Sequence, residues 1–167
     1  MILTNYWKWL DGVNTYASET ATARSLGIKN LSGTTVNLLT GPGGDSNLYA
    51  PRNSSFPYNL FVRVGTGTGE PTSSDYALGT DVTSSMTGMS FSCATTSNDS
   101  LKRTITCSGS NSTSSAITIT EVGIGKSIYP ANSSSMEDVL FAIVKLDTPV
   151  TVPGNGNFSI TFDWTEA

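Results

Sequence analysis

Hydrophobic residues recur at helical spacing in one segment, close to the N-terminus. Four aromatic or aliphatic residues follow the i, i+3, i+4, i+7 pattern of an amphipathic helix: Tyr6, Trp9, Leu10 and Val13. We expect a helix over residues 4–13, capped by Thr4 or Asn5 and ended by Gly12. Because an isolated helix of about ten residues is marginal in water, it must pack on its own domain or on a neighbouring subunit.

From Asn59 onward the pattern changes to the period of β-strands. Alternating or continuous apolar segments, separated by turn residues, predict the following strands: 60–64, 86–95, 101–108, 117–124, 139–144, 150–152 and 158–164. No helix alternates with them, so the chain is predicted to be all-β, an antiparallel β-sandwich or jelly roll with a short N-terminal helix. We expect three parts: an N-terminal helix and arm (1–40) that could anchor the chain, a Gly/Pro loop (41–58) and a sandwich body (59–167).

Two details of the strand pattern stand out. In the segment 117–124 the apolar residues change parity near Glu121, which indicates a β-bulge or a bend. The run Val139–Val144 is continuously apolar, so it is either covered on both faces or covered by a partner. Phe141 and Ile143 are the residues that we expect to face away from the core. A turn is expected at Asp147-Thr-Pro.

The two cysteines flank one predicted hairpin turn. A turn centred on Ser100 places Cys93 directly opposite Cys107, at the separation that a disulfide needs. A turn centred on Asp99 offsets the two cysteines by two residues and leaves buried free thiols. The sequence therefore leaves a disulfide and a pair of free thiols as alternatives.

Composition narrows the classes of function. Charged residues are 13% of the chain, and the net charge is -4, so no basic surface exists for a nucleic acid. The absence of histidine removes the commonest general base and metal ligand, together with the Ser-His and Cys-His nucleophile pairs. Two cysteines are too few for a Cys-rich zinc site. We expect no catalytic residues, no cofactor and no metal.

The sequence also lacks the patterns that are typical of a membrane span and of a signal peptide. No run of about 18 apolar residues occurs, so no membrane partner is expected. The N-terminal segment MILTNYWKWLDG lacks the basic and apolar regions of a signal peptide, so we expect synthesis in a cytoplasm.

Three blocks of the sequence resemble small all-β structural proteins of tailed-bacteriophage virions. They are VRVGTGTGEPTSSDYALGTDVT (62–83), ITITEVGIG (117–125) and VLFAIVKLDTPVTVPGNGNFSITFDW (139–164), and the segment NYWKWL fits the same group. Together they cover about two thirds of the chain, in order. The resemblance implies a non-enzymatic particle protein made in the bacterial host's cytoplasm and located in the virion, and it carries no catalytic residues.

Within that group, we expect a capsid decoration or cement protein that binds the major capsid protein and forms a homo-oligomer such as a trimer. The predicted interface consists of aromatic and aliphatic residues: Tyr6, Trp7, Trp9, Leu10, Phe141 and Ile143. Deleting residues 1–13 is expected to abolish particle binding and leave a folded sandwich. The alternatives are a tail, baseplate, collar or fibre component, or a receptor domain that stacks glycans on tyrosines and tryptophans.

Overall fold

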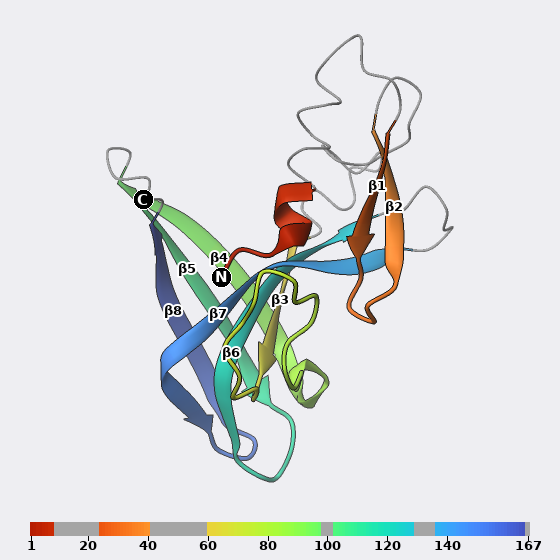
Figure 1. Cartoon of the computed structure of the whole chain (residues 1–167). Coiled ribbons are helices and arrows are strands. Elements are labelled where there is room, and N and C mark those ends of the chain that lie inside the picture. Colours follow the sequence, from red (N-terminus) through yellow and green to blue (C-terminus); the bar gives the residue numbers. More distant parts are fainter. Residues whose placement is uncertain (9–23, 41–59, 98–101, 129–135, 166–167) are drawn as a thin grey trace. The chain divides into compact units, whose positions relative to one another are not determined.

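The computed structural model describes residues 1–8, 24–40, 60–97, 102–128 and 136–165. These residues form a helix that begins at Thr4 and is described as far as Lys8, a short 3-10 turn at Thr83–Ser85, and eight strands (Figure 1). The strands are β1 (Arg24–Lys29), β2 (Thr35–Thr40), β3 (Leu60–Gly65), β4 (Met86–Ser97), β5 (Lys102–Asn111), β6 (Ile117–Ile128), β7 (Glu137–Val152) and β8 (Asn157–Thr165). The all-β class with a short N-terminal helix is thus confirmed. Residues 9–13 of the predicted helix and the loop 41–58 lie outside the described residues.

The strands form three sheets, and the chain divides into two compact units. The sheets have the orders β1-β2, β3-β6-β7 and β4-β5-β8, and the pairs β1–β2, β4–β5 and β5–β8 are antiparallel. Unit 1 comprises 1–61, 69–78 and 123–144, and unit 2 comprises 62–68, 79–122 and 145–167. In unit 1, residues of the N-terminal 40 pack together with parts of β6 and β7, and the expected division into arm, loop and body stays a prediction.

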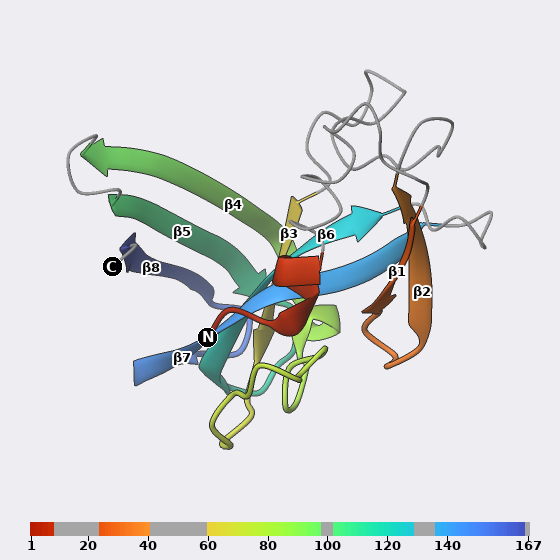
Figure 2. The same ribbon diagram turned by 45° about the horizontal axis from the view of Figure 1, so that its top comes forward.

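Unit 2 has a β-sandwich-like arrangement. Figures 1 and 2 show β5 between β4 and β8 along their whole length. Buried side chains from this sheet and from β3, β6 and β7 form one core: Val62, Val64, Met86, Cys107, Ile119, Val122, Val152, Phe158 and Ile160. On β8 the buried Phe158 and Ile160 alternate with the exposed Ser159 and Thr161, as the period-2 pattern predicts. The jelly-roll topology stays a prediction.

The apolar residues on either side of the parity change in β6 lie in one core, and the β-bulge or bend expected near Glu121 stays a prediction. Ile119 and Val122 have opposite parity, yet both are fully buried in the same core of unit 2. Glu121 lies between them and is itself buried, with 3% of its surface exposed.

β7 corrects one expectation. The segment Asp147-Thr-Pro makes no turn, because β7 runs as one strand from Glu137 to Val152. Pro149 lacks an N–H group, and a proline of this kind is tolerated on an outer strand, which β7 is in its sheet. Pro149 is exposed.

Unit 1 contains a hairpin that the sequence pattern did not predict. β1 pairs with β2 across a turn in which Gly33 has a φ of 81°, a conformation that favours glycine. The side-chain oxygen of Asn30 accepts hydrogen bonds from the backbone N–H groups of Ser32 (3.1 Å) and Thr34 (2.9 Å) and so closes this turn. Ile28 and Val36 anchor the hairpin in an apolar cluster of unit 1.

The apolar run of β7 is covered on both faces by the chain itself. Val139 and Phe141 pack with Ile28, Val36 and Ile128, whereas Leu140 and Ile143 belong to a second cluster with Leu3 and Leu78. Phe141 and Ile143 are only 8% and 1% exposed. The expectation that these two residues face away from the core is therefore wrong, because the N-terminal segment and the β1–β2 hairpin, which the strand pattern did not reveal, pack against them.

Candidate functional site

The N-terminal residues pair with β7 as an additional short strand. The backbone N–H of Leu3 donates to the carbonyl of Phe141 at 2.8 Å, and the N–H of Ile143 donates to the carbonyl of Met1 at 3.0 Å. Ile2 forms the antiparallel bridge with Ala142 between these bonds. The side chain of Leu3 is completely buried. This segment is thus part of the core of unit 1.

Asn5 fixes the first turn of the helix to unit 1. Its Nδ2 donates to the carbonyls of Lys29 (2.8 Å) and Leu140 (3.2 Å), and its Oδ1 accepts from the N–H of Lys29 (3.0 Å). Lys8, one turn further on, donates through Nζ to the carbonyl of Gly27 at 2.7 Å. The amide of Asn5 therefore bridges β1 and β7, and the helix is held in a fixed orientation.

This fixed helix exposes one large aromatic side chain. Tyr6 is half-buried, and its ring centroid lies 6.0 Å from that of Phe141 and 5.4 Å from that of Trp7, both pairs in T-shaped geometry. Trp7 is 56% exposed. Of the predicted interface residues, Trp7 is therefore on the surface and Tyr6 packs against it. Trp9 and Leu10 lie outside the described residues.

The cysteines occupy the register that offsets them. Phe91 pairs with Cys107 and Cys93 pairs with Ile105, so the two cysteines are offset by two residues and do not face each other. Cys107 is a free, fully buried thiol, and its burial raises its pKa to about 11. The side chain of Cys93 lies outside the described residues.

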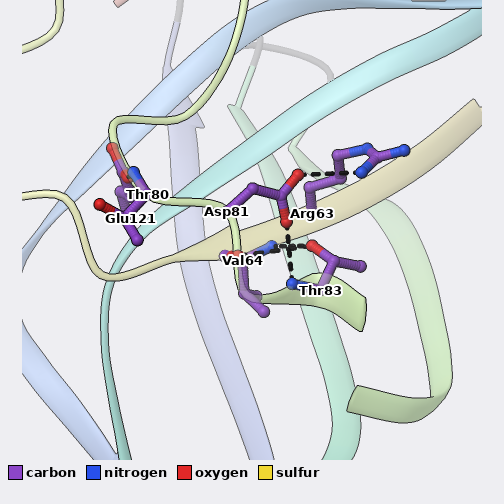
Figure 3. A network of polar contacts seen from close by, with 6 residues as sticks. All are labelled: Arg63, Val64, Thr80, Asp81, Thr83 and Glu121. Carbon is purple, nitrogen blue, oxygen red and sulfur yellow. Dashed lines mark hydrogen bonds and ion pairs between the residues drawn. The ribbon is translucent and has the colours of Figure 1, made fainter. Parts of the chain in front are cut away.

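A second polar site, which the sequence did not reveal, surrounds Glu121 in unit 2 (Figure 3). Its Oε1 accepts hydrogen bonds from the backbone N–H groups of Gly67 (3.0 Å) and Thr80 (3.3 Å). The carbonyl of Gly67 in turn accepts from the hydroxyl of Thr120 (2.7 Å) and from Nζ of Lys145 (3.0 Å). The N–H and the carbonyl of Gly67 are therefore both held by side chains of β6 and β7.

The position of Glu121 explains why part of the motif GTGTG is glycine. A Cβ at Gly65 would lie 2.5 Å from Oε1 of Glu121 and 2.8 Å from the carbonyl oxygen of Thr80. A Cβ at Gly67 would overlap the carboxylate of Glu121 and no other side chain or backbone atom among its nearest neighbours. Glycine is required at these positions because the buried carboxylate occupies the space that a side chain would need.

A partly exposed ion pair lies beside the buried carboxylate (Figure 3). Arg63 Nη1 and Asp81 Oδ2 are 2.9 Å apart, and Asp81 Oδ1 accepts from the N–H of Thr83 at 2.8 Å. Burial acts to raise the pKa of Asp81, but the hydrogen bonds from Thr83 and the hydrogen bond and charge of Arg63 outweigh it and hold that pKa below its ordinary value. The hydroxyl of Thr83 accepts from the N–H of Val64 at 3.0 Å, which fixes the 3-10 turn against β3.

The arrangement around Glu121 performs a structural role. The carboxylate is buried, and its Oε1 is engaged by two backbone donors. Across the described ranges, no group of three or more His, Cys, Asp or Glu side chains is placed to hold a metal ion. A single acidic residue inside the apolar strand ITITEVGIG was the sequence signal that could have revealed this site.

The alternative of a glycan-stacking platform concerns residues that are mostly outside the described parts. Its tyrosines are Tyr49, Tyr58, Tyr76 and Tyr129, of which Tyr76 lies within the described residues. The ring of Tyr76 is half-buried, with Nζ of Lys29 at 5.1 Å from the ring centroid. No helix in the described part of the chain has the length and apolar character needed to cross a membrane.

Compared with family models, curated proteins and solved structures, the chain matches none.

Proposed function

We propose that the chain is a non-enzymatic structural protein of a tailed-bacteriophage virion, and that it decorates the head by binding the major capsid protein. The observation that carries this proposal is the exposed Trp7 on a helix that Asn5 fixes to unit 1. Because Asn5 fixes the backbone that carries Trp7, less entropy is lost on binding than for a mobile segment, and tryptophan is among the residues that dominate interface energies.

The sequence blocks that resemble virion proteins support the same proposal. The first block supplies Gly65, Gly67 and Thr80, and the second supplies Glu121. These residues meet in a hydrogen-bonded site around the buried carboxylate of Glu121. The residues that these blocks contribute to the site therefore stabilise the fold, as a building block of a particle requires.

The experiment uses heads of the phage that encodes this chain, prepared from a mutant that lacks it. Purified protein is added to the heads, and bound protein is measured after sedimentation. Trp7→Ala is expected to weaken binding at least about 30-fold, because tryptophan anchors contribute about 2 kcal/mol or more. Met136→Ala is the matched control, since Met136 is another exposed apolar residue of unit 1, at 37%.

Truncation is a poorer test than this substitution. Deleting residues 1–13 removes Leu3 from the core and Asn5 from its hydrogen bonds, so unit 1 would lose its packing together with the anchor. Unaltered binding of the Trp7→Ala variant would refute the anchor. Labelling of the tail in place of the head would favour a tail or baseplate component, and selective binding on a glycan array would favour a receptor domain.

A further inference from the structure

We propose that β4 is a docking edge, at which a second copy of the chain adds its own β4 in antiparallel orientation. β4 is an outer strand of the sheet β4-β5-β8, and among the described residues no strand pairs with its other edge (Figure 2). An outer strand presents a row of backbone N–H and C=O groups that can template another strand. The occupant of such an edge is an extended chain segment.

β4 carries none of the charged residues or prolines that usually protect a free edge. The strand MTGMSFSCATTS carries no charged residue and no proline. Its register shifts lie at its two ends, between Thr87 and Ser90 and between Thr95 and Ser97. The stretch Ser90–Thr95 between these irregularities pairs without interruption with β5. Native sheets protect free edges with charges, prolines or bulges, so this stretch is suited to further pairing.

Both faces of β4 fit a copy of itself. On the outer face the hydroxyls of Ser90 and Ser108 are hydrogen-bonded at 2.7 Å, and Ser92 and Ala94 are exposed beside them. A second β4 would continue this pattern of small, uncharged side chains across the junction. On the inner face Phe91 is only partly buried against the core of unit 2, and a second β4 would cover it with its own apolar residues.

Two-fold symmetry makes the proposed pairing self-consistent. An antiparallel pair of identical strands is isologous, so each copy offers the same surface and the assembly closes as a dimer. Residues directly opposite each other in an antiparallel pair point to the same face. Two registers centre the antiparallel pair near the middle of Ser90–Thr95. In each of them, Ser92 of one copy lies directly opposite or diagonal to Ser92 of the other.

The test places charges at this position. Purified chain is expected to associate toward twice its mass of 17.6 kDa in sedimentation equilibrium. Ser92→Lys and Ser92→Glu should each raise the dimer dissociation constant by about tenfold or more, because like charges then face each other across the junction. An equimolar mixture of these two variants should recover association, a result that misfolding cannot produce.

The matched control is Ser159→Lys, an exposed position on the same face of the same sheet but on β8, at the opposite edge. It should associate like the unaltered protein. A chain that stays monomeric at millimolar concentration, equal weakening by Ser159→Lys, or no recovery in the mixture would each overturn the proposal. The assay contains no capsids, so its outcome is independent of head binding.

Discussion

The substitution Glu121→Ala tests whether this carboxylate stabilises unit 2. It removes the acceptor of the N–H groups of Gly67 and Thr80, which lie 3.0 and 3.3 Å from Oε1. Leaving a buried donor unpaired costs about 1–3 kcal/mol, so the free energy of unfolding should fall by about 2–6 kcal/mol. Glu121→Gln retains an acceptor of the same shape and should cost about 1–2 kcal/mol, since it loses mainly the charge.

A double-mutant cycle separates this contact from general damage. Gly67→Ala alone should cost about 1–3 kcal/mol, because its new Cβ overlaps the carboxylate of Glu121. In the Glu121→Ala background that space is free, and the same substitution should cost less than about 0.5 kcal/mol. Gly65→Ala is the control, because its Cβ would still lie 2.8 Å from the carbonyl oxygen of Thr80.

The assay is urea unfolding followed by far-ultraviolet circular dichroism. With a slope of about 2 kcal/mol per molar urea, Glu121→Ala should lower the midpoint by about 1–3 M. Equal costs of Gly67→Ala in the two backgrounds would refute the argument that Glu121 dictates glycine at this position. A cost of Glu121→Ala below about 0.5 kcal/mol, the range of ordinary surface substitutions, would refute its structural role altogether.

Three further predictions concern other parts of the chain. Leu3→Ala should lower the free energy of unfolding by about 2–5 kcal/mol in the same urea assay, because its side chain is fully buried; a cost near zero would show that the N-terminal strand does not pack. In a Cys93→Ala variant, iodoacetamide should modify Cys107 only after unfolding, as its burial and pKa of about 11 keep it a thiol; rapid labelling of the folded protein would contradict this. Because the folded-state pKa of Asp81 lies below its ordinary value of 3.8, the unaltered protein should be more stable than Asp81→Asn at neutral pH, and this difference should shrink as the pH falls below 3.8. The difference at neutral pH should be about 1 kcal/mol or less, since the ion pair is partly exposed, and a difference that grows in acid would reverse the assignment.

The strands that alternate cleanly could be predicted from the sequence. β8 places Phe158 and Ile160 inward because a period of two is a local property that one buried face is enough to produce. The parity change at Glu121 was visible for the same reason. The β1–β2 hairpin was not, because β1 (RSLGIK) is short and polar and is stabilised by pairing and by contacts of Ile28 with residues far along the chain.

The helix that carries Trp7 and the site at Glu121 also differ in how far the sequence predicts them. The sequence predicts Trp7 and Tyr6 as interface residues because they are aromatic residues of a short helix. The structure leaves Trp7 exposed and Tyr6 half-buried, and the interface itself stays a prediction. The site at Glu121 joins residues up to 78 positions apart, so no local pattern contains it. Phe141 was misplaced because its burial depends on Tyr6 and the hairpin, which are distant in sequence.

The most direct measurement is a cryo-electron-microscopy map of the intact particle of the phage that encodes this chain. We expect density for the chain at repeated positions on the capsid lattice, with Trp7 buried against the major capsid protein. Density that places Trp7 in solvent, or a particle whose head carries no copy of the chain, would contradict the account.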